Sequence, residues 1–554
     1  MRFFITELLV FCAEKCFLNI IKQFTKIFSS HQKLVFSKEL PVSSGGNIEI
    51  GQKLLKKANL FGYVLLDVKT DNPWRIFPFS EEVEVGIDGF SWLHDLAIIN
   101  NRSSRDLSEA WINLFPLGRL NVNTYSSSSR LIAILMNFSY LKITCEKTTL
   151  NKLKTIIKND YFFLNLYKNF SFNILEKLAI YHSLILSGYV FNFTKKKQKK
   201  MISSMTKLLL IYKAKAKMGE VRNPEELSEI FFYLLEIFEI AKILENDKPF
   251  IEVEKLRKLS GFFGSSIRYL QFGNGSLVSA HGGCLGNYNR YVKFLGEVTN
   301  YKRGDKICDL GFKRLDGARM SMIVDASPPL YGKRDRIAHA SFSSFELYYG
   351  SKAIFVNCGG GSRFGHEYRK YCQSSKAHNV LLFNEKSQCS FGKRFFSKST
   401  PYYYIKDGPR NTKINCINSI TEKIVELSHD AYKKDYGISV HRRISVDLLK
   451  NRVMGQDMVN PDGEPREKLR DTAVCLYFHV HPSIVCRKKK SGVLIEIPGD
   501  KKMFFTHKGG DLTMEKSTYV GDFFEPQEIT KLVIRNNVEK SESKISWKIE
   551  EIID

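Results

Sequence analysis

Two histidines and a thiol stand at the ends of predicted strands. The stretch RIAHASFSSFELYYGSKAIFVNCGGG predicts a hairpin with His339 a few residues before its first strand and Asn357-Cys358 at the end of its second strand. His378 immediately precedes the apolar run NVLLF. Imidazole nitrogen and thiolate sulfur are preferred ligands of Zn²⁺, so His339, Cys358 and His378 are candidate metal ligands. The alternative, in which each histidine caps a strand, remains open.

A second cluster, FGNGSLVSAHGGCLGNYNRY, spans residues 272–291. Its five glycines surround His281 and would let the backbone approach a ligand closely. Tyr288 and Tyr291 could supply acid/base hydroxyls or stacking faces. The Gly-Lys-Ser/Thr ending of a phosphate-binding loop is missing. A flexible loop between domains is the alternative interpretation.

A third candidate is the pair Arg222-Asn223, which stands directly before a predicted helix. Asn223 is followed by Pro224 and two glutamates, a typical helix start with asparagine as the cap. Capping is the role that local sequence favours for Asn223. An asparagine that caps a helix facing a cleft could also hold a carboxylate.

The elements that must position these residues show two patterns of apolar spacing. Apolar residues keep helical spacing from about residue 90 to 300, which predicts helical hairpins arranged as a bundle, solenoid or toroid. After about residue 305, short alternating runs separated by Gly, Asp and Asn predict antiparallel strands stacked as a sandwich. We therefore expect an N-terminal segment over 1–40, a helical domain over 41–305 and a β-sandwich over 306–554.

The 554-residue chain has the composition of a folded protein, with 43% hydrophobic and 26% charged residues. Its net charge of +26 would attract nucleic acid, an anionic membrane or an acidic polysaccharide, unless it reflects a general bias toward lysine. No nucleic-acid-binding motif accompanies the charge. Eleven cysteines without paired spacing argue against a disulfide scaffold.

The first residues, MRFFITELLVFCAEKCFLNIIKQF, begin like a signal peptide but include Glu7 and Glu14. Their apolar spacing suits an amphipathic helix lying on a surface. We expect no transmembrane span, because no uncharged apolar run has the required length of about 20 residues.

Taken together, these segments resemble the bacterial heparinase II/III family of polysaccharide lyases. IAHASFSSFEL, IFVNCGG, SSKAHNVLLF, SHDAY and HRRISV occur in the family's order over residues 310–445. The resemblance implies an (α/α) toroid followed by an antiparallel β-sandwich. It also implies β-elimination of uronate-containing glycans, with the uronate carboxylate neutralised, its neighbouring proton removed and the leaving oxygen protonated.

The resemblance also implies roles for single residues. Asn223 matches a position where relatives place a carboxylate-binding Asn or His. The family's catalytic tyrosine belongs in a segment where Tyr269, His281 and Tyr288 compete. We predict His281, with Tyr288 second and Asn223 beside them, as the catalytic group, and Arg222 and Tyr269 as substrate contacts.

Alignment on SFEL places Ile337 where the family has a catalytic histidine, and Ser341 where it has an aspartate. In zinc-containing relatives the ligands are a histidine, an aspartate and a second histidine, which here become His339, Asn357 and His378. Cys358 would have to replace the aspartate for a structural zinc to bind.

These inferences predict a lyase that cleaves an acidic polysaccharide and has no specific nucleic-acid partner. Its location would be the cell envelope or periplasm, with the cytoplasm as the alternative. A catalytically degenerate glycan-binding or scaffold protein is the second hypothesis. A protein that binds nucleic acid or membrane through charge alone is the third.

Overall fold

The computed structural model describes most of the chain, and every structural statement below concerns the described residues. These are residues 16–17, 19–21, 23–25, 34–41, 46–55, 86–99, 102–118, 124–171, 173–245, 249–283, 301, 310–332, 337–394, 402–461, 472–499, 501–521, 525–537 and 543–552. Most of the expected N-terminal segment, and the expected boundary at 305/306, lie outside this set.

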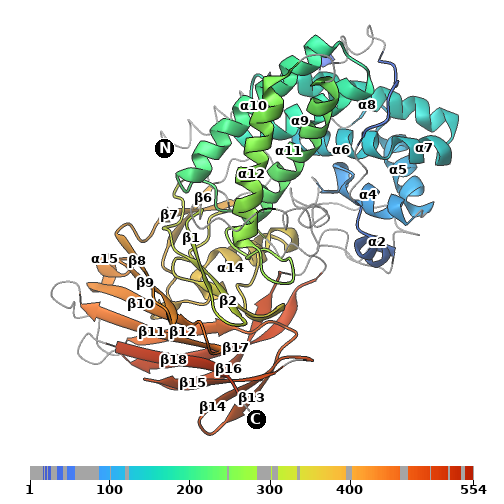
Figure 1. Cartoon of the computed structure of the whole chain (residues 1–554). Coiled ribbons are helices and arrows are strands. Elements are labelled where there is room, and N and C mark those ends of the chain that lie inside the picture. The colour runs from blue at the N-terminus through green and yellow to red at the C-terminus, as the bar shows by residue number, and fades with distance from the viewer. Residues whose placement is uncertain are drawn as a thin grey trace.

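The N-terminal part is helical, as predicted, and its helices stand together above the β-strands (Figure 1). The described helices are α2 (Ile48–Leu55), α4 (Ser91–Ile98), α5 (Arg102–Leu114), α6 (Thr124–Met136), α7 (Phe138–Thr144), α8 (Lys147–Tyr167), α9 (Ile174–Val190), α10 (Lys195–Lys217), α11 (Pro224–Glu245) and α12 (Ile251–Leu270).

Local sequence explains where these helices begin. Asn173 caps α9 by accepting a hydrogen bond from the Leu175 N–H, and Thr194 caps α10 through the Lys197 N–H. Pro224 opens α11, where a helix needs no donor from its first residue. Consecutive long helices pack as neighbours, α9 against α10 and α11 against α12, which is the arrangement of helical hairpins.

The C-terminal part is built from antiparallel sheets. Its strands are β1 (Phe312–Asp316), β2 (Met320–Asp325), β3 (Phe345–Tyr349), β4 (Lys352–Phe355), β5 (Leu381–Phe383), β6 (Ser390–Arg394), β7 (Tyr402–Asp407), β8 (Thr412–Asn418), β9 (Glu422–His429), β10 (Ile438–Asp447), β11 (Arg452–Pro461), β12 (Ala473–His479), β13 (Val485–Lys489), β14 (Gly492–Glu496), β15 (Lys502–Lys508), β16 (Asp511–Tyr519), β17 (Gln527–Asn537) and β18 (Ser543–Glu551). Short helices α14 (His366–Gln373) and α15 (Lys433–Tyr436) interrupt them.

The strands form one large sheet and smaller sheets stacked on it. The large sheet has the order β13-β14-β15-β18-β11-β10-β9-β8, and two four-stranded sheets have the orders β16-β17-β12-β5 and β1-β2-β3-β4. Inward side chains from all three share one apolar core, including Phe345, Phe478 and Trp547. The predicted architecture, a toroid-like helical domain followed by an antiparallel β-sandwich, is confirmed.

A second apolar core continues from the helices into the β part. It includes Phe263 and Leu270 of α12, and on the β side Phe312, Tyr348 and Val520. The ring of Phe272 stacks on that of Tyr348 with centroids 3.7 Å apart. The two parts are therefore joined by buried side chains as well as by the chain itself.

In the described part of the chain, no helix is long and apolar enough to cross a membrane.

Candidate functional site

Arg222, Asn223 and His281, predicted from separate segments, meet where the helices join the sheets. Arg222 and Asn223 directly precede α11, and His281 follows α12. Arg222 and His281 share the partner Asp325, the last residue of β2. Arg222 forms an ion pair with Asp325 and also donates to the carbonyl oxygens of Ser327 and Pro328, each at 2.8 Å.

The other carboxylate oxygen of Asp325 contacts the His281 ring. Its Oδ2 lies 3.1 Å from Nε2 of His281 and 2.7 Å from the Ser341 hydroxyl, which donates to it. The backbone N–H of His339 donates to Nδ1 of His281 at 3.1 Å. Because Nδ1 accepts this bond, the ring proton sits on Nε2 and points at Asp325. Both nitrogens of His281 are therefore held in bonds within the protein.

Asp325 is held ionised by its neighbours. Burial alone would raise the pKa of this carboxyl group, but the Arg222 guanidinium, the His281 ring and the Ser341 hydroxyl outweigh burial and lower the pKa to about 2. The buried charge of Arg222 is thereby matched by a full negative charge. Arg222, Asp325, His281 and Ser341 form what we call the junction network.

Asn223 caps α11, as its local sequence predicted. Its Oδ1 accepts from the backbone N–H groups of Glu225 and Glu226, at 2.8 and 3.4 Å. A Cβ atom on Gly283 would lie 2.7 Å from the same Oδ1, so only glycine lets this loop pass so close to the start of α11. Among the described residues the amide nitrogen of Asn223 makes no hydrogen bond, which leaves a donor for a ligand.

The glycines around His281 serve close backbone packing. Gly282 has φ of +86°, and a Cβ atom there would come within 3.0 Å of the Ile337 side chain. A Cβ atom on Gly360 would lie 2.3 Å from the Gly282 carbonyl oxygen. His281 itself adopts a left-handed φ of +46° and is 2% exposed. From the sequence, the glycines were expected to leave His281 accessible to a ligand. They instead let the backbone segments pack closely, and His281 is buried.

The expected metal ligands do not fit a zinc site. The His339 and His378 rings have centroids 5.3 Å apart, but both ring nitrogens of His378 are occupied, Nδ1 by Asn357 Oδ1 at 3.0 Å and Nε2 by the Cys372 carbonyl at 2.9 Å. Over the described ranges, no group of three His, Cys, Asp or Glu residues is arranged to hold a metal ion.

Cys358 contacts a tyrosine. Its thiol lies 3.5 Å from the Tyr371 hydroxyl, and burial raises the pKa of the thiol to about 12. Burial lowers the pKa of His378 to about 4 and that of His339 well below its usual range. In the described part of the chain, a buried cluster of hydrogen-bonded residues thus occupies the positions that the family resemblance assigned to a structural zinc site.

Of the two predicted tyrosines, Tyr269 lies among the described residues and Tyr288 does not. The Tyr269 hydroxyl accepts from the Arg314 backbone N–H at 2.8 Å, and this tyrosine is buried against β1. Tyr288 lies outside the described residues.

Sequence reasoning missed Asp325 and Glu346, although both can be recognised in retrospect. Asp325 is an acid at the end of the apolar run SMIV, and Glu346 interrupts the buried strand FELYY. Glu346 is fully buried and accepts from the backbone N–H groups of Asn357 and Ser279, at 2.9 and 3.2 Å. It thus ties β3 to the segment that carries His281.

Glu346 predicts a loss of stability as the pH rises toward 8. Burial raises its pKa from 4.5 to about 8, so between these values the folded protein keeps a proton that the unfolded chain has already released. This contribution to stability is complete below 4.5, is lost as the pH rises to about 8, and changes no further above that. We expect urea midpoints to decline from just below neutral pH to about 8 and then to level off, and Glu346→Ala to flatten the decline. An equally steep decline in the variant would contradict this prediction.

The comparisons with known proteins agree with this architecture. Residues 302–548 match the family model "Heparinase II/III-like, C-terminal". Heparinase III superposes with a TM-score of 0.61 at 14% identity, covering 97% of this chain and 89% of that one. The heparan sulfate lyase HepC from Pedobacter heparinus gives 0.54 at 13% identity, with coverages of 97% and 88%. No curated protein matches. At these identities the structural likeness shows the fold.

Proposed function

Because this chain carries a heparinase II/III-like C-terminal domain and shares the fold of polysaccharide lyases along nearly its whole length, we propose that it cleaves an acidic, uronate-containing glycan by β-elimination. The observation that carries the proposal is the convergence of Arg222, Asn223 and His281 where the two parts of the protein meet. The relatives' printed names also point to acidic polysaccharides as the substrate class.

We assign to Asn223 the binding of the uronate carboxylate. Elimination requires removal of the proton on C5, which becomes acidic enough only when the attached carboxylate is neutralised or hydrogen-bonded. The Asn223 amide nitrogen can donate such a bond while Oδ1 keeps its place at the helix start. The net charge of +26 would draw the anionic polymer toward the protein.

The proton transfer is assigned to Tyr288, which was the second choice from sequence. His281 has one ring nitrogen on Asp325 and the other on the His339 N–H, so it holds the junction network together and cannot accept a further proton without losing a bond. Tyr288 follows Gly283 by five positions in the sequence. Its phenol would remove the C5 proton and return a proton to the departing C4 oxygen.

The test is the ultraviolet absorbance of the unsaturated uronate product, measured with a panel of uronate polymers. We expect one of them to give a steady increase, and Tyr288→Phe to lower that rate by at least about 100-fold, a typical contribution of acid/base catalysis. Tyr291→Phe, in the same segment, is the matched control and should keep the rate. A full rate in Tyr288→Phe would remove this tyrosine from the mechanism.

A second candidate is glycan binding without cleavage. It is favoured by Ile337, which stands where the family has a catalytic histidine, and by the engagement of both His281 nitrogens. It predicts no unsaturated product from any polymer, together with binding of an acidic glycan that Tyr288→Phe leaves unchanged. Either function would place the protein in the cell envelope or periplasm, with the cytoplasm as the alternative.

A further inference from the structure

Helix α10 carries an unbalanced positive charge. Within its 23 residues it has nine lysines and no aspartate or glutamate. The lysines are Lys195, Lys196, Lys197, Lys199, Lys200, Lys207, Lys213, Lys215 and Lys217. Five of them fall in the first six residues, where the helix dipole disfavours cations. Two of these five, Lys197 and Lys199, lie over the aromatic rings of Phe193 and Phe250.

The neighbouring helix α12 carries acids among its cations. Lys255 pairs with Glu252, and both Arg257 and Lys258 pair with Glu254. In α10 the lysines crowd one another, and burial together with repulsion from Lys197 and Lys200 lowers the pKa of Lys168 at the end of α8. A bound anion would relieve this repulsion.

Apolar side chains stand among the exposed lysines of α10. Lys196, Lys200, Lys207, Ile211 and Met218 follow one another at spacings of four and seven residues, which places them on one face of the helix. All five are exposed, Ile211 at 52% and Met218 at 73%. We call this face the α10 stripe. It is basic toward the start of the helix and apolar toward its end.

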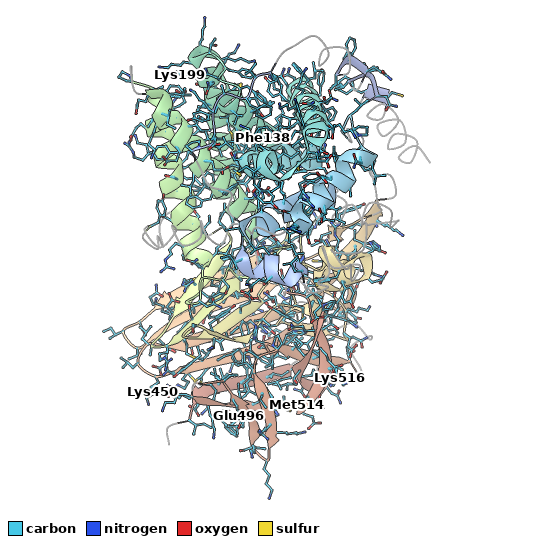
Figure 2. All side chains as sticks on the ribbon, turned by 90° about the vertical axis from the view of Figure 1, so that its right-hand side faces the viewer. Phe138, Lys199, Lys450, Glu496, Met514 and Lys516 are labelled. Carbon is cyan, nitrogen blue, oxygen red and sulfur yellow. The ribbon has the colours of Figure 1, made fainter. Side chains whose placement is uncertain are left out.

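The basic end of the α10 stripe lies far from the sheets. In Figure 1, α10 runs along the outer edge of the helical part. Figure 2 places Lys199, near the start of this helix, at the end of the molecule opposite Glu496 of β14. The lysines at the start of α10 are therefore separate from the proposed glycan site, whereas the apolar end of the stripe at Met218 precedes Arg222 by only four residues.

We propose that the α10 stripe binds the surface of an anionic phospholipid bilayer. Lysines attract the charged headgroups, and Ile211 and Met218, with the exposed Leu210 beside them, enter the apolar layer beneath. A soluble polyanion would satisfy the lysines but offers no apolar phase for these side chains.

The test is sedimentation of the full chain with vesicles of equimolar phosphatidylcholine and phosphatidylglycerol. We expect binding to these vesicles and little binding to phosphatidylcholine alone. Removing three lysines by K196Q/K200Q/K207Q lowers the partition coefficient by about 100-fold. The matched control K489Q/K490Q/K502Q removes the same charge from exposed positions at the other end of the molecule and leaves binding nearly unchanged. An equal loss in both variants would overturn the proposal.

A second variant separates a bilayer from a soluble polyanion. I211S/M218S keeps every lysine but should lower vesicle binding by at least about 10-fold, while its elution from heparin-agarose stays unchanged. If this variant binds vesicles like the parent chain, the stripe binds through charge alone and the bilayer proposal fails. Sedimentation requires no turnover, so the outcome is independent of the proposed lyase activity.

Discussion

Replacement of Asp325 by alanine lowers the free energy of unfolding by about 3–5 kcal/mol, because it leaves the buried Arg222 guanidinium without its counter-charge. The ion pair is 2–3% exposed on both sides, and the same carboxylate accepts from His281 and Ser341. Desolvation of an unpaired guanidinium is the largest part of the cost. Urea denaturation followed by circular dichroism measures it.

Two variants sharpen the experiment. Asp325→Asn keeps the shape but not the charge, so most of the loss should remain. Asp407→Ala breaks the exposed pair with Arg410, for which about 0–1 kcal/mol is expected. If Asp325→Ala costs no more than Asp407→Ala, the junction network is not what holds this corner together.

The second large effect is unfolding in acid. His339 and three further histidines are buried or nearly so in the β part. Burial lowers the pKa of each: to about 3 for His429, to about 4 for His481, and well below the usual value for His339 and His479. Below their ordinary pKa of 6.5, the unfolded chain binds protons that the folded protein does not. The contribution of these histidines to stability is therefore complete above 6.5 and falls steeply as the pH approaches 4.

The slope of the unfolding free energy against pH measures how many more protons the unfolded chain binds than the folded protein. His429 lies against the ring of Phe342, and its Nδ1 accepts from the Ala431 N–H, which suits only the neutral ring. We expect His429→Phe to make the acid decline shallower by about one proton. Urea midpoints at a series of pH values provide the measurement, and an unchanged slope would show that His429 binds protons equally in the folded and unfolded states, contrary to this prediction.

The architecture could be predicted from the sequence because periodicity reports burial directly. The stretch NPEELSEIFFYLLEIFEIAKIL became α11, with its start at the predicted cap. The predicted hairpin also formed and turns at Gly350-Ser351, with Tyr349 paired to Lys352. Farther along, the register shifts between Leu347 and Tyr348. A bulge depends on how a strand fits the core, which local spacing does not encode.

The site was predicted less well, for a physical reason. The types and positions of Arg222, Asn223 and His281 pointed to one region, and they do meet there. Whether a histidine transfers protons or supports a buried ion pair depends on partners distant in sequence, here Asp325 and the His339 N–H. Cys358 likewise lies against Tyr371, and no sequence motif indicates that contact.

The apolar core shared by the helices and the sheets limits how this protein can move. Turning one part against the other like the halves of a clamshell would separate Phe272 from Tyr348 and wet the surfaces around them. A long polymer would therefore have to be accommodated by movements of loops and side chains, while the helical part and the sheets keep their relative positions.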